Sequence, residues 1–216
     1  MQPVFVSGIG TGVGKTLVAA IVTEALDARY WKPVQAGFDD GSDTDWVRKR
    51  ISRPGERLLD EAYRLILPAS PHISAREEGI VIDLDRIARQ FGRLQALGEG
   101  PIVIEGAGGL LVPLNQREFM IDLIAKLGAR VLLVSRNYLG SINHSLLSAA
   151  ACKSRGLEVA GWIFNDQYLH YEDEIVTWTG LPAIASIPFK ADPNAAFVRE
   201  QAARIRPALL AALGSL

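Results

Sequence analysis

The sequence predicts an α/β fold with a mostly parallel central sheet and helices on both faces. Short apolar segments alternate along the chain with segments of helical periodicity. Most of the short segments are continuously apolar, which is typical of parallel strands buried on both faces. The first of them leads through a glycine-rich loop into a helical pattern.

Six short apolar segments are expected to form the strands of this sheet. Each is bounded by glycine, proline or polar residues, which commonly end strands. In chain order they are residues 3–6, 30–34, 101–104, 130–134, 159–164 and 183–187. Helical segments separate most of them, so successive strands can run in the same direction.

Helices are expected where apolar residues recur at offsets of three and four. The clearest apolar stripe consists of Leu84, Ile87, Phe91 and Leu94. We interpret this stripe as core packing. Weaker helical patterns cover residues 17–25 and 146–152. Glycine and proline interrupt residues 35–75, so a long, partly helical excursion between strands is expected there, and such excursions are often functional.

Length and composition favour one folded domain over residues 1–216. Hydrophobic residues make up 49% of the chain and charged residues 22%, which is enough to build a core. Lysine and arginine number 23 against 24 acidic residues, a net charge of -1. The chain therefore has no overall field to attract nucleic acid or an anionic membrane, and we expect neither as a partner.

No feature of the sequence points to secretion. The single cysteine, Cys152, lies in an apolar run and is expected to be a buried thiol. The first apolar run has no basic segment before it, and no stretch reaches the ~18 apolar residues of a membrane span. We expect a cytoplasmic protein.

Residues 8–16, with the sequence GIGTGVGKT, predict a phosphate-binding P-loop between the first strand and the first helix. Glycines let backbone N–H groups converge on phosphate oxygens, and the helix N-terminus favours the same negative charge. Lys15 could bridge the outer phosphates, and the Thr16 hydroxyl could ligate magnesium. The loop is a variant, because the usual pattern has glycine at the position of Ile9. It predicts a single P-loop NTPase-like domain.

The same glycines do not fit a dinucleotide-binding loop. A G-x-G-x-x-G pattern that starts at Gly8 ends on Val13, and one that starts at Gly10 ends on Lys15. Nicotinamide binding is therefore disfavoured.

Polar residues at the ends of apolar strands are candidates for ligand binding, because ligands of α/β sheets bind at the carboxyl ends of strands. Lys32 ends one strand, and the proline after it keeps its backbone extended. Glu105 closes the third strand; it could cap a helix, but opposite a P-loop we favour a magnesium ligand. Asp43 and Asp45 could supply a second oxygen ligand or begin a helix, since aspartate is a favoured N-cap residue.

A second helix N-terminus is predicted at residues 140–144, where free N–H groups could receive a carboxylate. His144 is interpreted as a structural residue of that helix's first turn. His72 could be structural or catalytic, and His170 is expected at the surface. Asn165 follows the fifth strand, where its amide could read the edge of a purine.

Six segments of the chain together resemble the dethiobiotin synthetase family. They occur in the family's order and approximate spacing: GIGTGVGKT (8–16), WKPVQAG (31–37), SPHISA (70–75), IEGAGGLLVPL (104–114), LGSINH (139–144) and GWIFND (161–166). The likeness covers about residues 3–190, with a poor match at 46–68 and at the C-terminal end. Six ordered segments are more specific than a P-loop alone.

The resemblance implies an ATP-dependent cyclo-ligase that uses magnesium. In such an enzyme, 7,8-diaminononanoate and carbon dioxide form a carbamate, ATP phosphorylates the carbamate, and the second amine closes a cyclic urea. ADP and phosphate are released. The resemblance also implies a homodimer in which two subunits share each site.

The resemblance assigns a role to each matching residue. ATP would be held by Gly12, Val13, Gly14, Lys15, Thr16, Glu105 and Asn165. Magnesium would be held by Thr16, Asp43 and Glu105. Lys32, Lys15 and Thr11 would serve catalysis. The substrate would contact Thr11, Lys32, Ser70 and Pro71, and its carboxylate would be received by Gly140, Ser141, Ile142 and Asn143 of the partner subunit.

The chain departs from the family pattern at three positions. Many members have an acidic residue at the position of Gly10, some another at Gly12, and many have serine or threonine at Ala36. Ala36 cannot donate a hydroxyl contact to the amine end of the substrate. The family register fits Asp43 as the metal ligand better than Asp45, which stays an alternative.

The main competing interpretation is a partition- or positioning-type ATPase, a switch protein on the same fold that binds DNA or membrane. Its loop usually has lysine at the position of Gly10, and the net charge of this chain offers no evident polymer-binding face. In the C-terminal segment 197–216, Pro207 is expected to interrupt any helix, and packing on the sheet or a dimer partner is favoured over membrane binding. A cobyrinate amidotransferase is disfavoured, because the chain has no room for a glutaminase domain.

Overall fold

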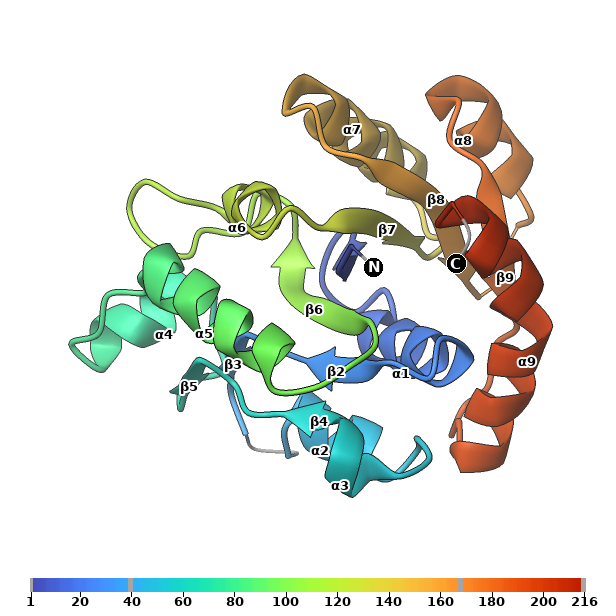
Figure 1. Cartoon of the computed structure of the whole chain (residues 1–216). Helices are drawn as coiled ribbons and strands as arrows, with labels where there is room; N and C mark the ends of the chain where they lie inside the picture. Colours follow the sequence, from blue (N-terminus) through green and yellow to red (C-terminus); the bar gives the residue numbers. More distant parts are fainter. Residues whose placement is uncertain (1, 39–40, 167–168, 215–216) are drawn as a thin grey trace.

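One parallel sheet forms the centre of the molecule (Figure 1). The structure, a computed structural model, describes residues 2–38, 41–166 and 169–214. In spatial order the strands are β4 (Leu58–Leu59), β2 (Arg29–Trp31), β6 (Ile102–Gly109), β1 (Val4–Gly8), β7 (Arg130–Ser135), β8 (Val159–Asn165) and β9 (Ala183–Ile187). Neighbouring strands all run parallel, which confirms the predicted fold class.

Helices cover both faces of this sheet. The described residues form the helices α1 (Lys15–Ala25), α2 (Asp43–Arg48), α3 (Pro54–Arg57), α4 (Pro71–Glu77), α5 (Leu84–Ala96), α6 (Met120–Lys126), α7 (Ser141–Ser154), α8 (Glu172–Thr179) and α9 (Ala195–Ala212), of which α4 packs on the small sheet of β3 (Val34–Ala36) and β5 (Tyr63–Leu65). Helices α1 and α9 lie side by side on one face, and α5, α6, α7 and α8 lie on the other (Figure 1).

The strand order explains this distribution. The connection from β1 through α1 reaches β2 on one side, whereas the connection from β6 through α6 crosses back over β1 to β7. Because parallel crossovers are right-handed, connections that run in opposite directions place their helices on opposite faces. The loops that follow β1, β2 and β6 meet at one edge of the sheet, where ligands of such folds bind.

Large aromatic side chains fill the core between the layers. Trp31, Trp162 and Phe5 are among the largest side chains that are fully buried. The ring of Trp31 on β2 stacks on Phe91 of α5 with a centroid separation of 5.7 Å. The predicted stripe on α5 is confirmed as core packing, with its last member, Leu94, only half-buried.

The strand expected at residues 30–34 is wrong as a single element. The chain leaves the main sheet after Trp31, and β3 (Val34–Ala36) pairs instead with β5 (Tyr63–Leu65) in a separate two-stranded parallel sheet. Pro33 lies at the transition and has no N–H to donate to a strand ladder. Lys32 therefore lies at the junction of the two sheets.

Two other elements run further than expected. Strand β6 continues to Gly109, so Glu105 lies within the strand and does not close it. Helix α9 continues through Pro207, so the expected interruption is also wrong. Packing against α1 and β9 holds this helix, which outweighs the backbone hydrogen bond that proline cannot make.

The remaining expectations for the scaffold concern Cys152 and membrane spans. Cys152 is buried, which confirms the expected buried thiol, and burial raises the pKa of that thiol to about 12. Within the described ranges, no helix combines the length and apolar character that crossing a membrane requires.

Candidate active site

The loop between β1 and α1 depends on glycine at its C-terminal end. Gly14 is the N-cap of α1 and has a φ of 86°, in the left-handed region that favours glycine. A Cβ atom there would lie 1.8 Å from the Nδ2 atom of Asn165. The same Nδ2 atom donates a hydrogen bond to the carbonyl of Val13 at 3.0 Å. The end of β8 is therefore tied directly to the loop.

The start of the loop shows how the variant glycine pattern is accommodated. Gly8 ends β1, and a Cβ atom on it would lie 2.7 Å from Val13 Cγ2 and 2.8 Å from the carbonyl oxygen of Gly10. Ile9, at the usual glycine position, turns its side chain into the core. In this loop the position that has no room for a side chain is therefore Gly8, one residue before the usual glycine position at Ile9.

Lys15 is folded back onto its own loop. Its ammonium donates to the carbonyl of Gly10 at 2.9 Å, and the residue is 7% exposed. Burial lowers the pKa of Lys15 to about 8; the charges of Glu105 and Asp43 oppose this shift and Lys32 adds to it. The loop therefore carries a desolvated cation close to the place where anions would bind.

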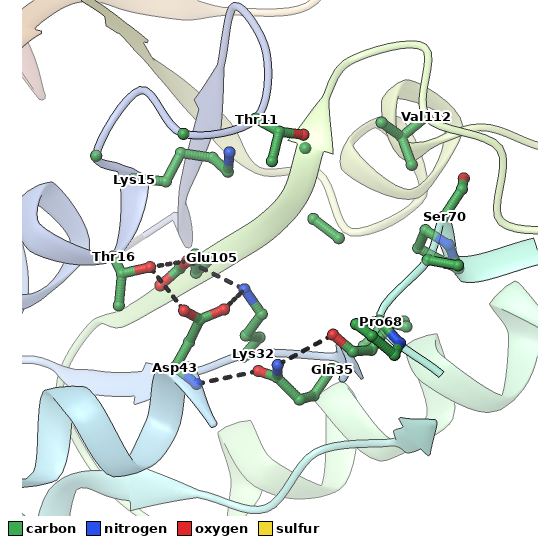
Figure 2. A pocket seen from close by; sticks show the side chains of 18 residues that line it. Thr11, Lys15, Thr16, Lys32, Gln35, Asp43, Pro68, Ser70, Glu105 and Val112 are labelled. Atoms are coloured by element: carbon green, nitrogen blue, oxygen red, sulfur yellow. Dashed lines mark hydrogen bonds and ion pairs between the residues drawn. The ribbon is translucent and has the colours of Figure 1, made fainter. Parts of the chain in front are cut away.

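Two carboxylates converge on the hydroxyl of Thr16, the first polar side chain after Lys15 (Figure 2). Thr16 Oγ1 lies 2.9 Å from Asp43 Oδ1 and 2.8 Å from Glu105 Oε1. A hydroxyl has one proton, so it can donate to only one of these oxygens at a time. The arrangement brings two anionic oxygens and a hydroxyl oxygen to one point.

Lys32 lies between the same two carboxylates. Its ammonium donates to Glu105 Oε1 at 3.0 Å and forms an ion pair with Asp43. Burial alone would lower the pKa of Lys32, but the charges of Glu105 and Asp43 outweigh it and raise the pKa above its ordinary value. Burial would raise the pKa of Asp43, and its contact with Lys32 reverses this and lowers it. The ammonium therefore stays charged.

Tyr30 is a member of this cluster that the sequence did not reveal. Its hydroxyl donates to Glu105 Oε2 at 2.8 Å, and its side chain is fully buried. Burial, followed by the charge of Glu105, raises the pKa of Tyr30 well above its usual value. The place of Tyr30 in an apolar run gave no sign of this contact, which depends on the pairing of β2 with β6.

The structure separates the roles of the two neighbouring aspartates. Asp45 forms a capping box with Ser42 at the start of α2, so it serves the helix end. Asp43 faces Thr16 and Lys32 instead. The side-chain amide of Gln35 accepts a hydrogen bond from the backbone N–H of Asp43 at 3.2 Å, which fixes this residue from behind.

A cavity of about 750 Å³ extends from this cluster. Ten of its lining residues carry a role predicted from the sequence: Thr11, Gly12, Gly14, Lys15, Thr16, Lys32, Asp43, Ser70, Pro71 and Glu105. Lining residues for which the sequence suggested no role include Val34, Gln35, Pro68, Ala69 and Val112. Figure 2 shows Pro68, Ser70 and Val112 on the side of the cavity away from Thr16.

The cavity has a polar end, lined from the main sheet, and a more apolar end, lined from the small sheet. The P-loop, Lys32 and Glu105 belong to the main sheet and its loops. Val34 and Ala36 belong to β3 of the small sheet. A ligand with a charged head and an aliphatic body fits such a gradient.

Several predicted residues do not line this cavity. Gly140, Ser141, Ile142 and Asn143 lie at the N-terminus of α7, where the Ser141 hydroxyl is hydrogen-bonded to Tyr171 at 2.7 Å. Asn165 and Val13 are adjacent to the P-loop but outside the cavity lining. Their predicted contacts with ATP, or with the substrate of a partner subunit, stay predictions.

The histidines lie apart from the carboxylate cluster. His144, in the first turn of α7, lies with its Nδ1 2.8 Å from the Tyr138 hydroxyl. The Nδ1 of His72 lies 3.0 Å from the Ser70 hydroxyl. His170 is exposed, as expected.

The donor set around Thr16 suits a hard divalent cation. Carboxylate and hydroxyl oxygens are ligands that Mg²⁺ accepts, and Mg²⁺ in phosphate sites is usually held by one or two carboxylates plus phosphate oxygens and water. Lys32 already holds a positive charge between the two carboxylates. The site offers two carboxylates, and neither here nor elsewhere in the described part of the chain do three or more acidic, histidine or cysteine side chains form a group that could hold a metal.

Fold and loop together define a P-loop NTPase-type protein. Solved structures agree on the fold: a ParA family ATPase from Chlorobium tepidum TLS has a TM-score of 0.59 at 16% identity and covers 100% of this chain and 95% of its own. The cell division protein MinD of Aquifex aeolicus has a TM-score of 0.61 at 16% identity, with 100% and 98% covered. Identities this low show a common fold alone.

Sequence comparisons identify the family. A family model described as an AAA domain matches residues 2–196. A protein of Rhodopseudomonas palustris (strain HaA2), named ATP-dependent dethiobiotin synthetase BioD, is 44% identical over 87% of this chain and 85% of its own. One of the same name from Christiangramia forsetii is 50% identical over 74% of each chain. The chain belongs to the ATP-dependent dethiobiotin synthetase family.

Proposed function

We propose that the chain is a carbon–nitrogen cyclo-ligase that converts 7,8-diaminononanoate, carbon dioxide and ATP into dethiobiotin, ADP and phosphate. The observation that carries the proposal is the convergence of the P-loop, Lys32 and two carboxylates at the polar end of one cavity. Family membership supports the same activity. We further propose that the protein acts in the cytoplasm without nucleic acid or membrane as a partner.

The P-loop would hold the phosphates of ATP. Backbone N–H groups of Gly12, Val13 and Gly14 precede the N-terminus of α1, whose dipole favours negative charge. Lys15 would leave the Gly10 carbonyl and neutralise the outer phosphates. Asn165, whose amide donates to the Val13 carbonyl beside the loop, would contact the adenine.

The reaction requires that the carbamate become a better electrophile. A carbamate oxygen attacks the terminal phosphorus as the bond to ADP breaks, and the resulting phosphate group then leaves when the second amine attacks the carbonyl carbon. Phosphoryl transfer depends mainly on positioning and charge neutralisation. Lys32 would stabilise the negative charge that develops, and Thr11, which also lines the cavity, would orient the reacting groups.

Thr16, Asp43 and Glu105 would hold Mg²⁺, and their oxygens fit that ion. The ion would supply charge neutralisation at the phosphates. Lys32 would turn from the carboxylates toward the carbamate, since its ammonium and the ion are attracted to the same oxygens.

The apolar end of the cavity would take the aliphatic chain of the substrate. Ser70 and Pro71 line it at the start of α4, and Ala36 lines it without offering a hydroxyl. The substrate carboxylate would be received by the N-terminus of α7, residues 140–143, from a second copy of the chain. A homodimer with shared sites is therefore part of the proposal.

One incubation tests the activity directly. The protein is supplied with Mg²⁺, ATP, ¹³C-bicarbonate and the diamine, and the cyclic urea is sought by its mass, with the diamine omitted as the control. Urea formation and diamine-dependent phosphate release are expected. An ATP hydrolysis rate that is the same with and without the diamine, together with co-sedimentation with DNA or vesicles, would favour the positioning-type ATPase. A shared fold is the support for that alternative.

A further inference from the structure

Tyr30 contacts the carboxylate cluster from behind, on the side away from the cavity. It lies in the middle of β2 with no exposed surface and does not line the cavity. Its hydroxyl lies 2.8 Å from Glu105 Oε2. A carboxylate can only accept, so the phenol is the donor.

Backbone pairing fixes this contact. Tyr30 is the Cα partner of Val103 in the parallel pairing of β2 with β6. Side chains two residues apart on a strand share a face. Glu105, two residues after Val103 on β6, therefore lies on the same face as Val103 and its partner Tyr30. The sheet thus places Tyr30 and Glu105 on one face and within reach of each other.

The two oxygens of Glu105 have different neighbours. Oε1 accepts from Thr16 and Lys32, both of which line the cavity and face its ligand. Among the described residues, the hydrogen bond to Oε2 comes from Tyr30. Because a carboxylate is planar, holding Oε2 in place also sets the direction in which Oε1 points.

We propose that Tyr30 is a positioning residue that aims Glu105 Oε1 at the cation that accompanies the nucleotide. The inference rests on the proposed function, in which Glu105 is a magnesium ligand. When Thr16 and Lys32 turn to the ligand, the bond from Tyr30 is the one that remains to orient the carboxylate. Partners of this kind typically change metal affinity by about 10- to 100-fold.

Calorimetry of ADP binding to Tyr30→Phe tests the proposal, because phenylalanine keeps the ring in the core and removes only the donor. Affinity is measured with Mg²⁺ and again with EDTA. We expect the Mg²⁺-dependent part of the affinity to fall about 10-fold. Metal-free ADP affinity should change by less than about twofold.

Tyr63→Phe is the matched control. Tyr63 is also buried, and its hydroxyl accepts from the backbone N–H of Asp83 at 2.9 Å, outside the cavity lining. This variant should keep the Mg²⁺-dependent affinity of the wild type. Equal losses in both variants would show a general effect of losing a buried hydroxyl and would overturn the proposal.

A double-variant cycle with Glu105→Gln tests whether Tyr30 acts through Glu105. In that background, Tyr30→Phe should change Mg²⁺-dependent ADP affinity by less than about twofold, because the carboxylate it aims is gone. Tyr30→Phe alone leaves the buried Glu105 carboxylate with one hydrogen-bond donor fewer. Glu105→Gln removes that charge, so the double variant does not carry this cost. Additive losses, or no loss in Tyr30→Phe itself, would overturn the positioning role alone. A wild-type protein that binds no Mg²⁺-ADP would overturn the proposed function as well.

Discussion

The ammonium of Lys32 lies 3.0 Å from Glu105 Oε1 in the interior, with 5% and 1% of the two side chains exposed. The same ammonium also pairs with Asp43. The ammonium thus supplies the positive charge that balances two neighbouring carboxylates. Removing either partner of such a buried ion pair lowers the free energy of unfolding, because the other charge is left buried without a counter-charge.

Lys15→Ala should reduce kcat by about a thousandfold, because the charge aimed at the outer phosphates is lost. Steady-state phosphate release in the presence of the diamine measures the effect. Lys153→Ala is the control, since Lys153 is an exposed residue of α7. A Lys15→Ala protein with a near-normal rate would contradict the assignment of the P-loop.

Lys32→Ala should lower kcat by about 100- to 1000-fold while ATP affinity changes by less than about tenfold. In the proposed reaction, its charge would matter most when negative charge develops during phosphoryl transfer. Single-turnover kinetics and a separate binding titration distinguish the two effects. Turnover at the wild-type rate would show that Lys32 has another role.

Lys32→Ala should also destabilise the ligand-free protein, by about 3 kcal/mol, because Asp43 and Glu105 lose their buried counter-charge. Urea unfolding measures the loss. Mg²⁺ should stabilise this variant more than the wild type, since the ion can then take the place of the ammonium. Equal responses to Mg²⁺ would argue that ion and ammonium do not share a position.

Asp43→Asn and Asp45→Asn should have separable effects although the residues are two positions apart. Asp43→Asn should weaken Mg²⁺-dependent nucleotide binding. Asp45→Asn should leave that binding unchanged and lower the free energy of unfolding by no more than about 1 kcal/mol, because it only weakens the cap of α2. Paired titrations with Mg²⁺ and EDTA decide between them, and the reverse pattern would reassign the ligand.

The pH dependence of ATP binding should reflect Lys15. Burial lowers its pKa to about 8, so the ligand-free protein loses this proton above that pH, and phosphates must recover it on binding. ATP affinity should be flat just below pH 8 and fall by up to about tenfold per pH unit above it. Calorimetry in buffers of different ionisation enthalpy detects the proton uptake, which Lys15→Met should abolish.

The same shift has a defined sign for stability. Between pH 8 and the ordinary lysine pKa of 10.5, the unfolded chain holds a proton on Lys15 that the folded chain has lost. The contribution of Lys15 to the free energy of unfolding therefore rises with pH across this window. Comparing wild type with Lys15→Met across the window isolates that contribution.

Mixing Asn143→Ala with Lys15→Ala tests whether subunits share sites. If residue 143 of one subunit completes the site of the other, half of randomly mixed dimers contain one fully intact site, and about a quarter of wild-type activity returns. No recovery after verified subunit exchange would place both residues in sites built from a single chain.

The sequence predicted the P-loop and the residues that converge on it, because apolar parallel strands bring their carboxyl ends to one edge of the sheet. Lys32 and Glu105 were found in this way even though β6 runs beyond Glu105. Residue type alone could not separate Asp43 from Asp45, since aspartate commonly begins helices. The structure shows that Ser42 is the N-cap of α2 and that its capping-box partner is Asp45.

The small sheet and the contact from Tyr30 were beyond the reach of the sequence pattern. The run at residues 30–34 is continuously strand-like, and its division depends on pairing of β3 with β5, about thirty residues further along the chain. Tyr30 resembles an ordinary core aromatic until the register of β2 and β6 is known. Both features arise from tertiary pairing, which local periodicity does not encode.

The main sheet and the small sheet diverge at Pro33 and line different walls of the cavity, so each wall could be redesigned independently. In the proposed reaction the phosphates bind at loops of the main sheet, whereas β3 and residues 68–71 line the opposite wall. Engineering the protein for diamines of other lengths would therefore begin with Val34, Ala36 and Pro68 and leave the P-loop, Lys32 and Glu105 unchanged.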